Sequence, residues 1–288
     1  MDAEKRRAWG VIGLTSPAYL WLLLTILLPL SAMLYFSFLT VAPFGSGQPA
    51  LTVENYAAFF EKDFYRVLAW RSIKLGIHVT LACVLLGYPA ALGLARFVRG
   101  RWREALFLLI VLPFWSNALV RTFSWTMVLR EDGLVDRGFH ALFPGAPSLG
   151  LWLTYPAIVI GLVHAYLPYM ILTCYISLQA IDDSLIEAAR SLGGSARVVF
   201  LRVLLPLSLP GLLAGVVLIF VPVIGSFMEP RILGGSGATM LGTVIEEQFT
   251  RVFNWPLGGA LSFILLAIVL LIAAASYPLL RRNLQAAA

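Results

Sequence analysis

The stretch over Asp182–Pro206, DDSLIEAARSLGGSARVVFLRVLLP, lies between two apolar segments and carries the clearest local signals in the chain. Ser184, followed three residues later by Glu187, forms a capping-box pattern, which is typical of the start of a helix. The pair Gly193–Gly194 supplies the backbone freedom with which helices end. The stretch therefore predicts a short helix over Leu185–Leu192.

A second helical run follows this short helix. Ser195 stands where it can cap a helical run that passes through Arg197 and Arg202 and reaches Pro206 at the membrane. A helix as short as the first one is marginal alone and needs a surface to dock against. Its apolar and small side chains share one face at helical spacing: Leu185, Ala188, Ala189 and Leu192. Two interpretations stay open from the residues alone: the face packs on its own protein, or it projects into a groove of a partner.

The composition places the chain in a lipid bilayer. Of its 288 residues 60% are hydrophobic and 12% are charged, whereas soluble domains carry about 25% charged residues. Six apolar stretches approach the roughly 20 residues that a helix needs to cross the hydrocarbon core; they run near 11–39, 73–95, 105–129, 151–178, 207–228 and 257–280. The sequence therefore predicts an all-α membrane protein with six transmembrane helices in one domain, residues 1–288.

The basic residues predict the orientation. They gather on one side of the predicted membrane, in the segments Lys5–Arg7, Arg96–Arg103, Arg190–Arg202 and Arg281–Arg282. Because short cytoplasmic loops are rich in Lys and Arg, both termini are expected in the cytoplasm, as an even number of spans requires. The first apolar stretch is too long for a signal peptide and is expected to be retained. The net charge of +6 thus indicates membrane lipid as a partner and not nucleic acid.

Several kinds of chemistry are missing from the sequence. It contains no phosphate-binding P-loop, no metal-ligand cluster and no Gly-x-Ser-x-Gly nucleophile motif. Cys83 and Cys174 lie in apolar runs, where cysteine is usually a small packing residue. The chain is therefore expected to be no enzyme and to bind no cofactor itself.

The loop also carries a resemblance to a known family. Its residues Glu187-Ala188-Ala189, Gly193, Val203 and Leu205-Pro206 stand at the spacing of the "EAA" loop of binding-protein-dependent ABC importer permeases of the MetI-like type. Only Val203 departs, from the commoner isoleucine. The resemblance implies the type I importer permease fold and a coupling helix, within the loop 182–206, that docks on a cytoplasmic ATPase subunit.

The resemblance also implies roles for single residues. Glu187 would make a polar contact with the ATPase, Ala188 and Ala189 would allow close approach, and Gly193 would permit the turn. Ser184 would cap the helix, and Pro206 would fix its junction with the fifth span. ATP and Mg²⁺ would be bound by the partner ATPase and not by this chain.

Further motifs resemble the spermidine/putrescine branch of these permeases: 112–125 (LPFWSNALVRTFSW), 166–172 (YLPYMIL), 227–235 (FMEPRILGG) and 254–258 (NWPLG). That branch implies a second, homologous permease, two ATPase subunits and a periplasmic solute-binding protein. Relatives that carry 4-aminobutyrate-like amino acids or opines share much of these motifs. An ion-driven secondary transporter is the rival class, but the paired repeats and mid-membrane charges that it predicts are not evident.

A polyamine path needs aromatic faces and a few carboxylates. The candidates are Trp115, Phe123, Trp125, Tyr166, Tyr169 and Glu229. The alternative is that the aromatic residues anchor helix ends at the membrane interface. Arg121 lies inside the third predicted span, where a charge is costly unless it is paired or faces a cavity. We expect it to pair with an acid near the outer surface or to contact the binding protein.

Overall fold

The computed structural model describes residues 2–43 and 47–287, and within them it contains helices and one isolated bridge, Leu39–Leu51, but no β-strand. Five helices are long and apolar enough to cross a membrane: Gly13–Ser37, Asp63–Phe97, Tyr155–Gln179, Ala196–Ile224 and Trp255–Ala274. A bent pair, Arg101–Trp115 and Ala118–Leu142, makes a sixth crossing if it is counted as one. The predicted all-α transmembrane fold is therefore confirmed.

The chain forms two compact units, and the first comprises the described residues up to Asp63 together with Ile245–Leu266. It holds α1 (Asp2–Ser37), α2 (Glu54–Glu61) and the start of α13 (Trp255–Ala287). The Asn55 side-chain amide donates to the carbonyls of Ser37 and Leu39 at 3.0 and 2.8 Å, which fixes α2 against the end of α1. From Leu14 to Leu30 the large side chains of α1 are exposed, as expected of a helix surrounded by lipid.

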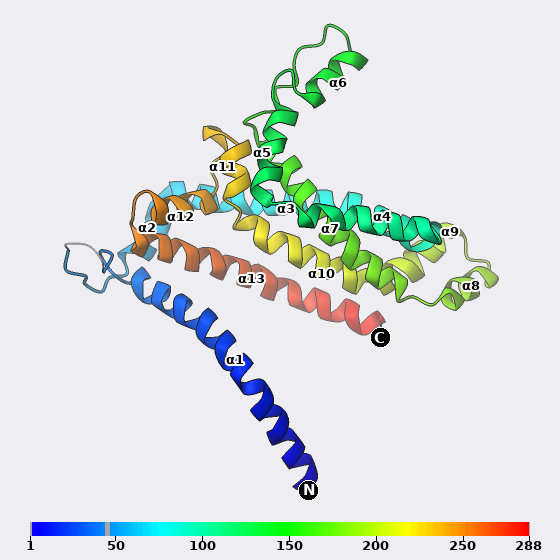
Figure 1. Cartoon of the computed structure of the whole chain (residues 1–288), viewed down its shortest axis with the longest axis horizontal. Helices are drawn as coiled ribbons and strands as arrows, with labels where there is room; N and C mark the ends of the chain where they lie inside the picture. The colour runs from blue at the N-terminus through cyan, green and yellow to red at the C-terminus, as the bar shows by residue number, and fades with distance from the viewer. Residues whose placement is uncertain (1, 44–46, 288) are drawn as a thin grey trace. The chain divides into compact units, whose positions relative to one another are not determined.

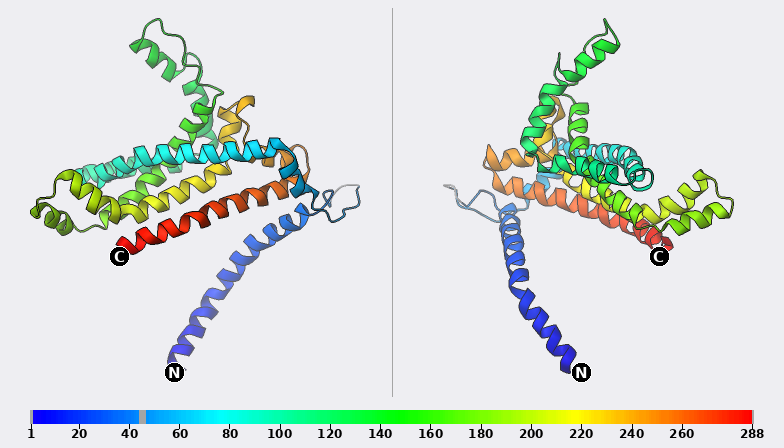
Figure 2. Two further views of the ribbon diagram at one scale, coloured as in Figure 1. Left: turned by 180° about the vertical axis from the view of Figure 1, so that it is seen from behind. Right: turned by 45° about the vertical axis from the view of Figure 1, so that its right-hand side comes forward.

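The second unit is built around α7 (Tyr155–Gln179) and α10 (Leu205–Ile224), which pack along their length. Gly215 permits this approach, because a Cβ there would lie 2.6 Å from Thr173 Oγ1. Small residues at such contacts are typical of membrane helices. The third long helix, α3 (Asp63–Leu92), continues through a π-helical turn, η1 (Gly93–Phe97). Figures 1 and 2 show α3, α7 and α10 running side by side, with buried Leu75, Leu162 and Ile219 among their core residues.

The third predicted span, 105–129, is not straight. It consists of α4 (Arg101–Val111), a 3₁₀ turn, η2 (Leu112–Trp115), and α5 (Ala118–Leu129). The segments Arg101–Trp115 and Ala118–Leu142 meet at 99°. Pro113 lacks an N–H for helix continuation, and the Asn117 side chain accepts the Leu119 N–H at 2.8 Å and so starts a new helix. This break turns α5 away from α4 (Figure 1).

The expected outer connections contain short helices: α6 (Leu134–Leu142), α11 (Met228–Leu233), a 3₁₀ turn, η4 (Ser236–Ala238), and α12 (Leu241–Thr250). Asp136 organises the connection that contains α6, because its carboxylate accepts from Ser148 Oγ and the Leu149 N–H, both at 3.0 Å. On the opposite end of the second unit, α8 (Asp183–Ser191) and α9 (Ala196–Val199) form a hairpin beyond the ends of α7 and α10 (Figure 2). A π-helical turn, η3 (Phe200–Leu204), joins α9 to α10.

Candidate functional site

A cavity of about 440 Å³ lies in the second unit, where α5, α7 and the α10–α11 junction meet. Three of the predicted path residues line it, namely Tyr166, Tyr169 and Glu229. Phe114, Phe227 and Arg121 also line it. Segments more than 100 residues apart in sequence thus bring a carboxylate, a guanidinium and four aromatic rings to one hollow.

Glu229 is the carboxylate of this cavity. It lies in the first turn of α11 and is only 9% exposed, which is rare for an acid. Ser226 Oγ donates to Glu229 Oε2 at 2.7 Å and holds the group in place. A buried carboxylate with one hydroxyl partner keeps lone pairs free, so the site is suited to a positively charged donor.

The aromatic rings form a continuous wall beside Glu229. The rings of Tyr166 and Tyr169 lie with centroids 5.9 Å apart, and Phe114 meets Tyr169 edge-on at 4.6 Å. Tyr166 and Tyr169 are three residues apart on α7 and so share one side of the helix. Their faces offer cation–π contacts to a ligand in the cavity.

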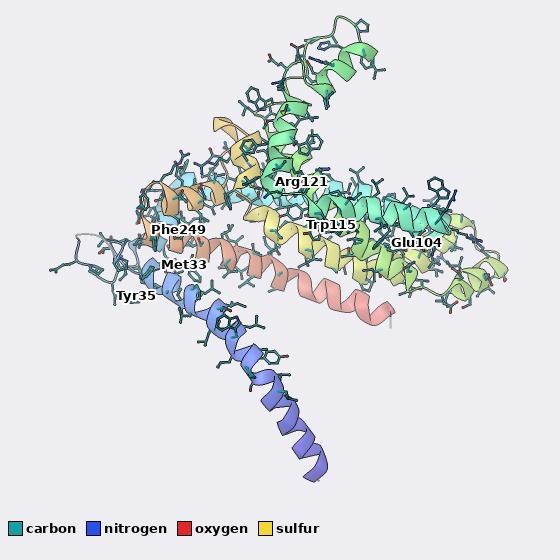
Figure 3. All side chains as sticks on the ribbon, viewed as in Figure 1. Met33, Tyr35, Glu104, Trp115, Arg121 and Phe249 are labelled. Atoms are coloured by element: carbon teal, nitrogen blue, oxygen red, sulfur yellow. The ribbon has the colours of Figure 1, made fainter. Side chains whose placement is uncertain are left out.

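Arg121 lies at the break between α4 and α5, and its Nη1 donates to the Pro113 carbonyl at 3.1 Å. Within the described residues no carboxylate lies at ion-pair distance from it, so this part of the chain does not form the ion pair, one of its two expected roles. The other, contact with the binding protein, stays a prediction. Figure 3 shows Arg121 on α5 close to this break and Trp115 at the end of the preceding turn. The same carbonyl also accepts the Ser116 N–H and Oγ–H at 3.2 and 2.7 Å, so the guanidinium adds a third donor at the break. The residue also lines the cavity.

The remaining predicted path residues lie elsewhere. Trp125 lines a separate hollow of about 370 Å³, where its Nε1–H donates to His164 Nδ1 at 3.2 Å. Trp115 is 87% exposed and Phe123 is also exposed, and neither lines the two hollows. For these two residues the interface-anchor interpretation matches their exposure.

The predicted short helix is α8, but its cap is different from the predicted one. The N-cap is Asp182 and not Ser184: the Asp182 carboxylate accepts the Ser184 N–H at 2.8 Å, and the helix begins at Asp183. This bond from the backbone of Ser184 lowers the pKa of Asp182. Glu187 does not reach back to the cap and has no hydrogen bond or ion pair among the residues described, so its carboxylate is available to a partner. Aspartate is also a favourable N-cap residue, and the sequence offers two adjacent aspartates as well as Ser184, so the residue types alone do not identify the cap.

The other end of α8 closes as a Schellman motif. The Gly194 N–H donates to the Ala189 carbonyl at 3.0 Å and the Gly193 N–H to the Arg190 carbonyl at 2.9 Å. Gly193 has φ = +82°, which ordinary L-residues adopt only with strain. The predicted helix-ending role of this glycine pair is confirmed. The predicted cap at Ser195 is confirmed as well, since its Oγ accepts the Val198 N–H.

The predicted face of α8 divides in two. Ala189 packs with Ile186 against the core of the second unit. Leu185 and Ala188 are exposed, and Leu192 is 90% exposed. The helix therefore packs on its own protein along one side and still presents an apolar stripe, Leu185–Ala188–Leu192, outward.

Pro206 lies inside a continuous helical run and does not separate the hairpin from α10. It is the second residue of α10, directly after the π-helical turn η3. Proline cannot donate to the carbonyl four residues before it, and the wider turn accommodates that loss. The predicted junction at Pro206 is thus a change of helical pitch.

Arg96 is a residue whose role sequence reasoning missed. Its Nη1 contacts Asp183 Oδ1 at 2.5 Å, and its Nη2 donates to the carbonyls of Leu178 and Ile181 at 2.7 and 2.9 Å. The side chain is only 15% exposed. Its partners lie more than 80 residues away, so no local pattern could have indicated them; the sequence placed Arg96 only among the cytoplasmic basic residues.

Comparison with known proteins decides the family. The family model described as "Binding-protein-dependent transport system inner membrane component" matches residues 84–286. This chain belongs to that family. The permease is 33% identical over 268 residues to the spermidine/putrescine transport system permease protein PotB of Haemophilus influenzae, covering 92% of the chain and 93% of that protein.

Solved structures show the same fold as the permease. A chain of a bacterial ABC transporter involved in the import of the acidic polysaccharide alginate superposes with a TM-score of 0.74 at 17% identity, covering 97% of this chain and 98% of that one. The same transporter in complex with an alginate pentasaccharide-bound periplasmic protein superposes with 0.71 at 15% identity, over 97% and 96% of the two chains. The family match and the relation to PotB make the permease a transport subunit of the inner membrane. The family match includes α8 and the Glu229 cavity.

Among the residues described, the permease has no group of three or more His, Cys, Asp or Glu side chains that could hold a metal ion. The chemistry of its cavity is that of binding a charged, partly apolar solute.

Proposed function

We propose that this permease passes small organic cations, polyamines such as spermidine and putrescine, across the inner membrane as the membrane subunit of an ABC importer. The observation that carries the proposal is the buried Glu229 carboxylate, which shares a cavity of about 440 Å³ with Tyr166 and Arg121. The relation to PotB, whose name states a spermidine/putrescine transport system, supports the same solute class.

The cavity suits a solute that must leave again. Removal of a carboxylate from water is unfavourable unless a donor or cation compensates it, so Glu229 favours an ammonium group. The tyrosine faces and Phe114 contact the methylene segments and add cation–π attraction. Arg121 on the same cavity offsets the negative charge and prevents a deep electrostatic trap.

The apolar stripe of α8 supports docking on an ATPase subunit. An exposed Leu192 and Leu185 on a short helix outside the membrane would be unfavourable in water and fit a groove on a partner. Two such ATPase subunits, with ATP and Mg²⁺ bound to them, would close and displace α8. Glu187 is available for a polar contact with them.

The assembly includes two components besides the ATPase subunits. A second, homologous permease would pair with this chain, and a periplasmic binding protein would deliver the solute, as the alginate transporter's complex with its periplasmic protein suggests. Both termini would lie in the cytoplasm because basic residues flank the spans on that side. ATP-driven closure would open the cavity outward, and hydrolysis would open it inward.

Uptake by reconstituted vesicles tests the proposal. The assembled importer in proteoliposomes, with ATP inside and binding protein outside, is offered radiolabelled putrescine, spermidine and 4-aminobutyrate. We expect ATP-dependent uptake of the two polyamines. Uptake of none of the cations, with uptake of a neutral or anionic solute, would overturn the proposal.

The position of Arg121 favours one second candidate. A guanidinium and a carboxylate in one cavity also match the two ends of a zwitterionic ω-amino acid. Preferential uptake of 4-aminobutyrate, together with its loss in Arg121→Gln, would support this candidate over a polyamine.

A further inference from the structure

The end of α3 and the start of α8 are joined by one side chain. Arg96 in η1 donates to the Leu178 carbonyl in the last turn of α7, to the Ile181 carbonyl in the following link, and to the carboxylate of Asp183 at the first residue of α8. A single guanidinium thus contacts the end of one helix, the connection and the start of the next.

Electrostatics favours this arrangement on both sides. The last carbonyls of α7 have no partner within their helix and carry the negative end of its dipole, which attracts a cation. Asp183 lies at the positive end of the α8 dipole. The planar fork of arginine reaches three acceptors in fixed directions, and a lysine ammonium at the same place could not reproduce that geometry.

Apolar packing between η1 and the hairpin is incomplete. A hollow of about 310 Å³ lies between them, lined by Phe97, Ile186 and Phe200 together with Arg96 and Asp183. Side chains across a hollow of this size do not transmit displacement as a packed core does. The polar contacts of Arg96 are therefore the firm connection between α3 and the hairpin.

Helix α3 makes polar contacts along its whole length. The Leu241 N–H donates to the buried Ser72 Oγ at 3.0 Å near its outer end. His78 contacts the Tyr155 hydroxyl at 2.8 Å, and Tyr88 contacts the Ser208 hydroxyl at 2.7 Å. Movement of α3 therefore acts on α7, on α10 and on the first residue of α12.

We infer that Arg96 is a positioning residue that transmits the displacement of α8 into α3. This inference rests on the proposed function, in which α8 is moved by an ATPase. The chain itself links α8 to α7 and α10, whereas Arg96 links α8 directly to the end of α3.

The test compares transport with ATP hydrolysis in the assembled importer. Arg96→Ala and Arg96→Lys are reconstituted beside wild type and beside Arg99→Ala, an exposed arginine of the same loop that lines the same hollow. We measure three quantities for each variant: recovery of the ATPase with the permease, ATP hydrolysis without solute, and solute moved per ATP. Transport is measured with polyamine-loaded binding protein outside the vesicles. We expect Arg96→Ala to retain ATPase recovery and hydrolysis within twofold and to lose at least tenfold in solute per ATP. Arg96→Lys should fall between it and wild type, and Arg99→Ala should match wild type.

Two results would overturn the inference. One is an unchanged ratio of solute to ATP in Arg96→Ala. The other is failure of both Arg96 variants to assemble, because that would make the residue purely structural. Absence of ATP-dependent uptake in wild type would instead refute the proposed function, so the two failures are distinguishable.

Discussion

Replacement of Gly193 measures how much the left-handed glycine at the end of α8 contributes to the stability of this helix. Gly193 has φ = +82°, and a Cβ added there meets no atom within 4 Å. Steric overlap is therefore absent, and only the left-handed backbone remains unfavourable, by about 1–2 kcal/mol for an ordinary L-residue. Alanine offsets part of this cost, because it lowers the conformational entropy of the unfolded chain relative to glycine, which stabilises the folded state by about 0.4–1 kcal/mol. The net cost for Gly193→Ala is about 1 kcal/mol, which is roughly fivefold in the opening equilibrium of α8.

Two further substitutions at Gly193 extend the prediction. Asparagine tolerates the left-handed region, so Gly193→Asn should cost less than alanine. Valine is β-branched and should approach about 2 kcal/mol, or roughly 30-fold. The expected order of destabilisation is Asn, then Ala, then Val.

Hydrogen exchange in lipid nanodiscs gives the measurement. Exchange of the peptide over 183–194 is followed by mass spectrometry, with a peptide from α10 as internal reference. Gly138→Ala is the control, because Gly138 has open space around it but an ordinary φ; it should leave exchange of α8 unchanged. Equal exchange for Asn, Ala and Val would refute the reasoning that the left-handed glycine closes the helix.

Three other perturbations test separate parts of the structure. Glu229→Gln should lower polyamine uptake about 10- to 100-fold, since a charged hydrogen bond contributes about 1.5–3 kcal/mol; Glu247→Gln is the control, and equal effects of both would contradict a special role for the cavity. Gly215→Val should lower the melting temperature of the purified permease by forcing α7 and α10 apart, because a Cβ there lies 2.6 Å from Thr173 Oγ1; an unchanged melting temperature would mean that the helices do not pack as described. The pKa of Asp182 is lowered, so its carboxylate stabilises α8 fully above the ordinary aspartate pKa, and this stabilisation is lost as pH falls through the lowered value. In wild type, protection of α8 against hydrogen exchange, corrected for intrinsic rates, should decrease over that range. In Asp182→Asn it should be independent of acid pH.

The transmembrane architecture could be predicted because apolar length alone determines which segments cross a bilayer. The same criterion could not find the 99° break at Ser116–Asn117, since hydropathy carries no direction. Pro113 and Asn117 were the available signals: one removes a donor and the other caps a new helix. They indicate a break but not its angle, which depends on packing against α7 and α11.

The candidate site could be predicted only where its chemistry is local. The end of α8 at Gly193 followed from two adjacent glycines, whereas the cap moved from Ser184 to Asp182 because both residue types cap helices. Glu229 was selected as an acid beside an apolar span, and it lines the cavity with Tyr166. Arg121 and Arg96 required the fold, because their surroundings come from distant segments.

The π-helical turn over Phe200–Leu204 fixes the angular register of α10. An α-helix advances about 100° per residue, and a π-helical turn contains one residue more than an α-helical turn would. If the same residues Phe200–Leu204 were wound as an α-helical turn, every later side chain would be rotated by about 100°, and Gly215 would turn away from α7. Deletion of one residue from this turn would instead restore an α-helical turn and leave Gly215 facing α7, so the π-helical turn decides which side of the span is buried.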